Sequence, residues 1–209
     1  MLNFENLDKA AYPGTGDFDI PEIPSFGFSG ELAKTEFIPY NYARTCGTPE
    51  NKGVHFFVDD YQFARLWNKP DIYLEKLRQF KFVLAPDFST YSDMPRAMQI
   101  YNHYRKHWIA RYLTVHNIAV IPTISWSTPD SFEWCFDGEP RGSVVAISNV
   151  SCLRNPTARR LFDLGFKKMK EVLQPSAILC YGAELDGTIN IKPHYTRIKE
   201  ARENGRTRS

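Results

Sequence analysis

The sequence lacks the short motifs that identify the commonest nucleotide-dependent enzymes and hydrolases. It contains no phosphate-binding loop ending in Gly-Lys-Ser/Thr and no Gly-x-Gly-x-x-Gly fingerprint. These two gaps count against an ATPase or a nicotinamide enzyme of the usual kind. The Gly-x-Ser-x-Gly turn of the common serine hydrolases is absent as well. Any chemistry must therefore come from residues that no fixed spacing identifies.

Cysteines and long apolar runs are also scarce. The four cysteines, Cys46, Cys135, Cys152 and Cys180, contain no pair with the two-to-four-residue spacing of a zinc knuckle. The longest apolar runs have the length of a strand, far short of the about 20 residues that span a membrane. The first ten residues contain no apolar stretch typical of a signal peptide. We expect reduced cysteines, a cytoplasmic protein and no membrane partner.

The formal net charge of +2 is too small to indicate a nucleic-acid partner by itself. Residues 192–209 carry six Lys or Arg against two Glu, a net charge of +4, which leaves −2 for the rest of the chain. A basic end of this kind is either a solvated tail or an arm that contacts phosphates. We assign residues 191–209 to a basic C-terminal tail and leave both roles open.

The 209 residues fit one domain, with 43% apolar and 24% charged residues. Residues 1–50 are rich in Pro and Gly, which disfavours long helices there. Phenylalanines recur among them, whereas disordered segments avoid aromatic residues. The pattern predicts an extended N-terminal arm over residues 1–50 that packs on an α/β domain formed by residues 51–190.

Five apolar runs of strand length alternate with segments of helix length. The predicted strands are 54–58, 80–85, 118–121, 143–147 and 177–181, and the predicted helices are 61–79 (interrupted at Pro70), 95–116, a short 130–136, and 158–173. The alternation indicates an α/β fold with about five mostly parallel strands. A full eight-unit barrel needs about 250 residues, so we expect an open three-layer sheet or an incomplete barrel.

The two long helices carry periodic apolar side chains that we expect to face the sheet. In 95–116 these are Ala97, Tyr101, Tyr104, Trp108, Tyr112 and Val115, and in 158–173 they are Leu161, Leu164 and Met169.

Polar residues gather just after the predicted strands, where parallel α/β sheets bind ligands. The candidate catalytic residues are Asp87, Asp59 and Asp60, and the candidate binding residues are Ser89, Tyr91, Trp126, Asn149 and Tyr181. Carboxylates and aromatic rings are thus predicted to meet at one rim of the sheet.

Asp87 is the leading candidate because it directly follows an apolar strand. A carboxylate there can act as a base, a nucleophile or a metal ligand, although Asp is equally suited to a turn or helix cap. Asp59 and Asp60 point to opposite faces of an extended strand, so at most one can join Asp87, and the other can cap the next helix. Two such carboxylates could hold Mg²⁺ or Mn²⁺, or divide the acid and base roles. Trp126 is either a stacking platform for a base or sugar, or a core residue.

His103 and His107 fall at i and i+4 of helix 95–116, a spacing that can chelate a metal ion. Three basic residues, Arg105, Lys106 and Arg111, lie close by in the same helix. They favour the alternative that this side of the helix is a solvated basic surface.

Six segments of the chain stand out together: Val54-His-Phe-Phe-Val-Asp-Asp-Tyr61, Pro86-Asp-Phe-Ser-Thr-Tyr-Ser-Asp-Met-Pro95, Ile121-Pro-Thr-Ile-Ser-Trp126, Cys135-Phe-Asp-Gly138, Ser143-Val-Val-Ala-Ile147 and Tyr181-Gly182. These segments resemble an uncharacterised bacterial family, a domain of unknown function found in phages and integrative mobile elements. The resemblance covers about residues 35–183, and its Pro-Asp-Phe-Ser stretch is fairly specific. It implies a phage or mobile-element accessory protein and supplies no catalytic residues.

Three functions fit these observations. The first is an enzyme, a hydrolase or transferase, that acts on a nucleotide, a modified base or nucleic acid through the strand-end carboxylates. The second is a non-catalytic binder of nucleic acid or of a host defence protein. The third is a protein that sequesters a signalling nucleotide without turnover.

Overall fold

The computed structural model describes residues 11–153 and 155–191. The helices of this part are α1 (Ala64–Asn68), α2 (Asp71–Leu77), α3 (Arg96–Val115) and α4 (Pro156–Leu173), with short 3₁₀ helices η1 (Leu32–Lys34), η2 (Tyr40–Thr45), η3 (Pro49–Asn51), η4 (Asp60–Gln62) and η5 (Pro129–Glu133). The strands are β1 (Gly14–Thr15), β2 (Ile20–Pro21), β3 (Glu36–Pro39), β4 (Lys52–His55), β5 (Phe82–Leu84), β6 (Val120–Ile121), β7 (Val144–Ser148), β8 (Ala177–Tyr181) and β9 (Ile189–Ile191). None of the described helices is both long and apolar enough to cross a bilayer.

Seven of the strands are parallel and run in chain order. β3-β4-β5-β6 form one sheet and β7-β8-β9 another. A parallel bridge between Thr123 and Ala146 joins them, and the Ala146 amide donates to the Pro122 carbonyl at 2.7 Å. The predicted α/β class is confirmed. Two of the parallel strands were not predicted: β3, which lies inside the Pro-rich segment assigned to the arm, and β9, which is three residues long. The short antiparallel pair β1 and β2 was not predicted either.

The combined sheet curls into an incomplete barrel. Strands β4 and β8 are four places apart, a separation of about 19 Å in a flat sheet. Nevertheless the His55 ring at the end of β4 lies 4.6 Å from the Tyr181 ring at the end of β8, and Phe57 stacks on Tyr181 at 5.0 Å. The described residues contain no pairing between β3 and β9, so the barrel is not closed.

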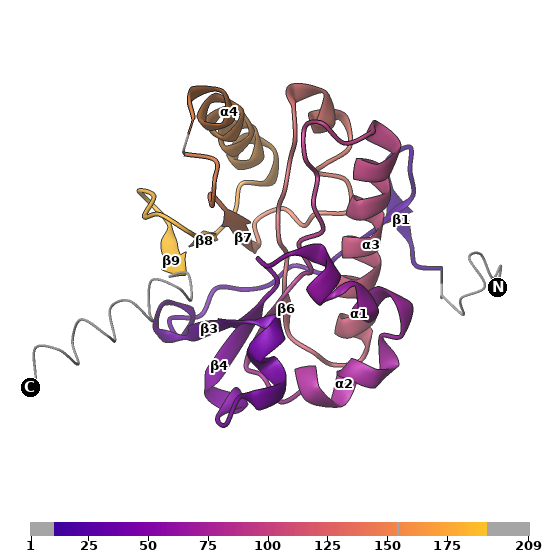
Figure 1. Cartoon of the computed structure of the whole chain (residues 1–209), viewed down its shortest axis with the longest axis vertical. Helices are drawn as coiled ribbons and strands as arrows, with labels where there is room; N and C mark the ends of the chain where they lie inside the picture. Colours follow the sequence, from indigo (N-terminus) through magenta and orange to yellow (C-terminus); the bar gives the residue numbers. More distant parts are fainter. Residues whose placement is uncertain (1–10, 154, 192–209) are drawn as a thin grey trace, which may run out of the picture.

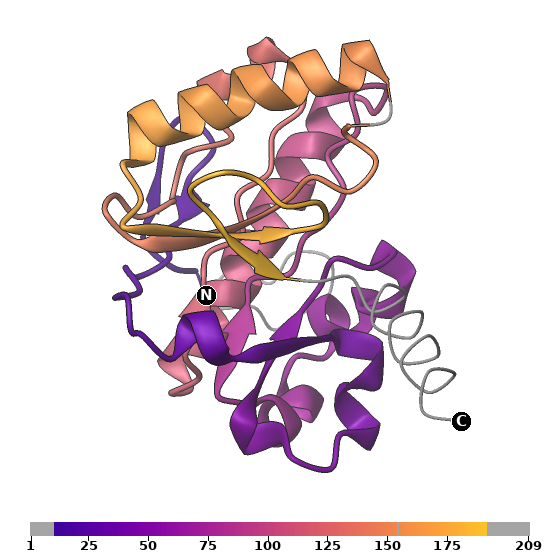
Figure 2. The same cartoon turned by 90° about the vertical axis from the view of Figure 1, so that its left-hand side faces the viewer.

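Alternate residues of the strands face two sides of this curl. An inner apolar cluster takes Phe37, Leu84, Ile121, Ala146 and Leu179 from five strands. A first outer cluster packs β3–β6 against α1, α2 and α3, and a second packs β7 and β8 against α4. Figure 1 shows α4 and α3 on these outer surfaces, and Figure 2 shows α4 lying across β7–β9. Helices outside and side chains inside are the arrangement of a parallel barrel.

The segment that precedes β3 crosses the amino ends of the strands. The Phe26 amide donates to Ser143 Oγ at 2.9 Å, and the Phe26 carbonyl accepts from the Val144 amide at 2.9 Å. The Phe26 ring packs edge-on against Phe82 at 5.6 Å. These contacts cover the amino ends of β5 and β7, so the carboxyl ends form the other edge of the barrel.

Helix α3 buries a different face from the one its apolar periodicity predicts. Trp108 and Tyr112 are buried as expected, but Tyr101 and Val115 are exposed. The buried face also contains Gln99, Asn102, His103, Lys106 and His107. The prediction was wrong for these positions because polar partners on neighbouring loops satisfy the buried side chains.

Helix α4 begins at the Asn155 cap, whose side chain accepts a hydrogen bond from the Ala158 amide at 2.8 Å. It buries Phe162, Gly165, Met169 and Leu173. Leu164, which was expected to face the sheet, is exposed instead. The face of α4 that packs on the sheet includes Gly165, a residue that the search for periodic apolar side chains does not select.

Gly165 is required by the close approach of Trp126. A Cβ atom at this position would lie 2.1 Å from the indole Nε1, and Phe162 holds the indole from the side at 5.6 Å between ring centroids. Trp126 is therefore half-buried under α4, where it packs against the outer cluster. Its role as a stacking platform stays a prediction.

We predict that Gly165→Ala lowers the free energy of unfolding by about 1–3 kcal/mol, because overpacking outweighs the gain in helix propensity. Chemical denaturation followed by circular dichroism measures it. The double variant Gly165→Ala/Trp126→Phe should recover most of the loss. The control Leu164→Ala, on the exposed face, should change stability by less. A stabilised Gly165→Ala protein would contradict the close packing.

Candidate functional site

The loop after β5 is held at the carboxyl edge by Asp60. Its carboxylate accepts the Ser89 amide at 3.1 and 3.2 Å and the Ser89 hydroxyl at 2.8 Å. From the other side, the Asn102 side-chain amide of α3 donates to the Ser89 carbonyl at 2.6 Å. Asp60 thus joins the segment after β4 to the loop after β5 and fixes the chain two residues beyond Asp87.

Asp87 lies inside this fixed loop. Its side chain is mostly buried, and Oδ1 accepts no hydrogen bond from any described residue. Burial raises the pKa of Asp87 to about 7, against the opposing charge of Lys106 and with a smaller contribution from the Asp60 charge. The carboxyl group therefore changes its protonation state near neutral pH, as a general acid or base does.

Lys106 supplies the positive charge that opposes the rise in the Asp87 pKa. It projects from α3, is 1% exposed, and donates to the Thr123 carbonyl and to Glu139 Oε1, each at 2.7 Å. A lysine inside an amphipathic helix is typical of a solvated surface, so its burial beside the site was not predictable from spacing.

Cys152, in the loop after β7, is a second residue that the strand-end candidates did not include. Burial raises the pKa of its thiol, and the Asp87 charge adds to the rise. Cys152 in turn contributes to the raised pKa of Cys180, which burial brings to about 11. Both cysteines are therefore thiols at neutral pH. Cys152 follows β7 by four residues, so the rule that examines strand ends could have found it.

The other predicted site residues divide between structural and exposed positions. The Asn149 amide exchanges hydrogen bonds with the Ala183 backbone at 2.8 and 2.9 Å, so it clamps the turn after β8. Tyr181 belongs to the inner cluster. Tyr91 is 65% exposed, and Asp59 is exposed and does not cap η4 with its side chain. The structure thus brings together Asp60, Asp87 and Ser89.

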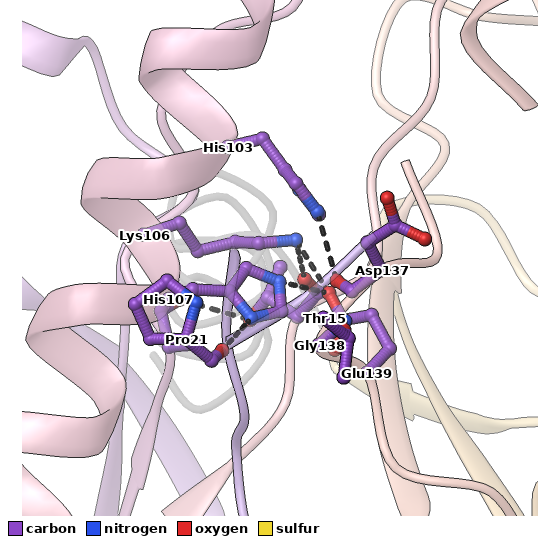
Figure 3. A network of polar contacts seen from close by, with 10 residues as sticks. Thr15, Pro21, His103, Lys106, His107, Asp137, Gly138 and Glu139 are labelled. Atoms are coloured by element: carbon purple, nitrogen blue, oxygen red, sulfur yellow. Dashed lines mark hydrogen bonds and ion pairs between the residues drawn. The ribbon is translucent and has the colours of Figure 1, made fainter. Parts of the chain in front are cut away.

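A buried polar network lies beside the site, between α3 and residues 137–139 (Figure 3). Glu139 Oε1 accepts from Lys106 and lies 2.9 Å from His107 Nε2. His107 Nδ1 lies 2.8 Å from the Pro21 carbonyl, and His103 Nε2 lies 3.1 Å from the Asp137 carbonyl. Burial lowers the pKa of both histidines. For Glu139, burial acts to raise the pKa, but Lys106 and His107 outweigh it and the pKa is lowered.

The alternative of a solvated basic surface at His103 and His107 was wrong, because both rings and Lys106 are buried. The two histidines and Glu139 could each offer one ligand atom to a metal ion, within 4.8 Å of one another. The Lys106 ammonium, however, already supplies positive charge to Glu139 at 2.7 Å. The chemistry of this set is that of an ion-pair network, and it connects α3 to the loop that leads into β7.

We predict that Lys106→Met lowers the free energy of unfolding by about 3–5 kcal/mol, because it leaves the Glu139 charge buried without its main partner. The double variant Lys106→Met/Glu139→Leu should recover most of this loss. A matched control is Glu133→Gln, which breaks the exposed pair with Arg96 and should cost below about 1 kcal/mol. Denaturant unfolding measures all three. Equal losses in the buried and exposed pairs would contradict the assignment.

Comparison with known proteins places the chain in a phage-associated family. A family model described as a domain of unknown function, DUF4417, matches residues 16–200. The Gene 1 protein of Mycobacterium phage L5 is 38% identical over 159 residues, which cover 73% of this chain and 69% of that protein. The Gene 1 protein of Mycobacterium phage D29 is 34% identical over 181 residues, which cover 83% of this chain and 64% of that protein.

The chain thus spans about two thirds of the length of these relatives. No solved structure matches it. The family model covers the whole described barrel together with the loop that carries Asp60, Asp87 and Ser89. The chain belongs to the DUF4417 family, a domain family shared with mycobacteriophage Gene 1 proteins.

Proposed function

We propose that the protein is an enzyme in which Asp87 transfers a proton during a reaction on a nucleotide or nucleic acid. The observation that carries this proposal is the buried Asp87 oxygen, which has no hydrogen-bond donor among the described residues and belongs to a carboxyl group with a pKa of about 7. Carboxyl groups whose pKa is raised in such positions are typical of general acid–base sites.

The surroundings of Asp87 support a role in chemistry more than a role in stability. A structural aspartate collects hydrogen bonds, as Asp60 does from Ser89. For Asp87, burial together with the smaller effect of the Asp60 charge outweighs the Lys106 charge, so the pKa is raised and the ionised form is disfavoured. An unsatisfied buried group of this kind costs stability and is expected where function requires it.

The substrate class is supported by an arginine next to the site. The Arg105 guanidinium lies 4.0 Å from the centre of the Phe88 ring, and Phe88 directly follows Asp87 in the chain. The Nη2 atom of Arg105 donates to Asn102 Oδ1. A planar cation at a strand-end site suits a phosphate group. Mg²⁺ or Mn²⁺ held by Asp87 together with Asp60 is part of the proposal, since a divalent cation would relieve the repulsion between the two carboxylates.

We predict that Asp87→Asn stabilises the protein at pH 8 and leaves stability nearly unchanged at pH 4. The folded-state pKa lies above the unfolded value, so the folded protein binds the extra proton between about pH 4 and 7 and loses this stability as the pH rises. Asparagine mimics the protonated acid at all pH values. The gain at pH 8 should be about 2–4 kcal/mol, because a difference of one in pKa corresponds to about 1.4 kcal/mol. Calorimetric melting temperatures at both pH values measure it.

Two carboxylates serve as controls for this measurement. Asp60→Asn removes an acceptor of the Ser89 amide and hydroxyl, and should lower stability by about 1–3 kcal/mol at pH 8. Asp59→Asn changes the same charge at an exposed position and should have an effect within about 0.5 kcal/mol. A clear loss of stability in Asp87→Asn at pH 8 would show that Asp87 is a structural acceptor.

The activity itself is tested by screening nucleotides and short nucleic acids, with and without Mg²⁺ or Mn²⁺, for product formation. We predict that Asp87→Asn lowers kcat at least about 100-fold while the protein stays folded. Full activity in this variant would end the proposal. If the wild type binds these compounds and no product forms, the function is binding or sequestration without turnover.

A further inference from the structure

A groove on the outer side of β3 and β4 has the chemistry of a nucleic-acid site. Its volume is about 720 Å³, within the range of about 300–1,000 Å³ that ligand sites occupy. It is bounded by η2, η4, α1 and α2 and lined by three tyrosines and three cations: Tyr40, Tyr61, Tyr73, Arg44, Arg65 and Lys76.

The cations of this tyrosine groove are not neutralised by acids. None of the described residues that line it is acidic. Neither Arg44 nor Arg65 has a carboxylate partner among the described ion pairs, whereas eight other pairs are formed, most of them on the surface. Like charges that gather in a groove without counter-charges attract an anion, and they come from three separate elements, as contacts along a phosphate backbone do.

The tyrosines differ in how firmly they are held. Tyr40 stacks on Phe56 at 4.8 Å and meets Tyr73 at 6.1 Å, so these two rings form the rigid wall. Tyr61 is 77% exposed and presents its ring to solvent. An exposed ring beside uncompensated cations is the arrangement on which unpaired bases stack.

The groove is connected to the proposed active site through the chain. Tyr61 directly follows Asp60, whose carboxylate holds Ser89 and whose charge reaches Asp87. A nucleic acid with a base on Tyr61 therefore contacts η4, the same short helix whose Asp60 positions the Asp87 loop.

We infer that the tyrosine groove binds single-stranded nucleic acid, with a base on Tyr61 and phosphates on Arg44, Arg65 and Lys76. Duplex DNA offers phosphates but keeps its bases stacked, so it cannot use the Tyr61 ring. The inference rests on the proposed function, since it names the substrate class of the Asp87 site.

The test is fluorescence anisotropy with a labelled oligothymidylate of about 12 nucleotides, within the site sizes of such grooves. Tyr61→Ala and Arg65→Gln should each raise Kd about tenfold, which corresponds to the loss of one stacked base or one phosphate contact. Arg65→Gln should also reduce the slope of log Kd against log salt by about 0.7. Arg160→Gln, the same charge change at an exposed position of α4, should leave Kd and slope unchanged. Melting temperatures confirm that each variant is folded.

Unlabelled competitors identify the source of the ligand. Oligothymidylate should compete far better than thymidine monophosphate or a duplex of equal length. Equal competition by the mononucleotide or the duplex would overturn the single-strand assignment. No binding by the wild type, or groove variants that bind as the wild type does, would overturn the site itself.

Failure of the groove is distinguishable from failure of the proposed function. Oligothymidylate binding that depends on Tyr61 and Arg65, with no turnover of any nucleotide or nucleic acid, would support the groove and end only the enzyme proposal. Turnover of nucleotides that depends on Asp87 but not on Tyr61 or Arg65 would leave the enzyme proposal standing and remove only the groove.

Discussion

The packing of Tyr181 against His55 and Phe57 holds the parallel sheet in its curled shape. These rings join the ends of strands that a flat sheet would hold about 19 Å apart. Once the sheet curls, alternate side chains have only two environments, an inner cluster and an outer surface that must be covered by helices. The same curl gathers the carboxyl ends of the strands, so that the connections after β4, β5 and β7 bring Asp60, Asp87, Ser89 and Cys152 to one edge.

Polar burial is distributed unevenly around this edge. Both carboxylate oxygens of Asp60 accept from the Ser89 amide, which fixes the loop after β5. The Asn149 side chain bonds the Ala183 backbone through both its oxygen and its nitrogen, which fixes the turn after β8. At Glu139, one carboxylate oxygen is shared between Lys106 and His107, and these bonds fix α3 to the loop that leads into β7. The second Glu139 oxygen and Asp87 Oδ1 are both buried without a donor among the described residues. Glu139 is paired through its other oxygen with Lys106 and His107, whereas Asp87 has no such ion pair among the described residues. The loops fixed around Asp87 allow its unsatisfied oxygen to stay buried, since an unfavourable group persists only where the surrounding structure is rigid.

The tyrosine groove and the barrel edge are built by the same short elements. The connections after β3 and β4 are 3₁₀ helices and short α-helices, and η2, η4, α1 and α2 among them line the groove. One of them, η4, carries Asp60 toward the barrel and Tyr61 toward the groove. The proposed polymer-binding surface and the proposed catalytic carboxylate would thus be connected through one short element, without a second domain.

Local patterning by itself determined the α/β alternation, the five central strands and the positions of α3 and α4, because apolar runs and helix periodicity are properties of neighbouring residues. It also marked Asp60, Asp87 and Ser89, since polar residues after buried strands are read directly from the chain. Only the tertiary structure decided between an open sheet and an incomplete barrel, because the curl depends on contacts between strands far apart in sequence. The same holds for the burial of Lys106, His103 and His107, which required partners at Thr123, Asp137 and Glu139. Spacing along one helix cannot show which side chains another segment will cover, and for that reason it indicated a solvated surface where the folded chain has an ion-pair network.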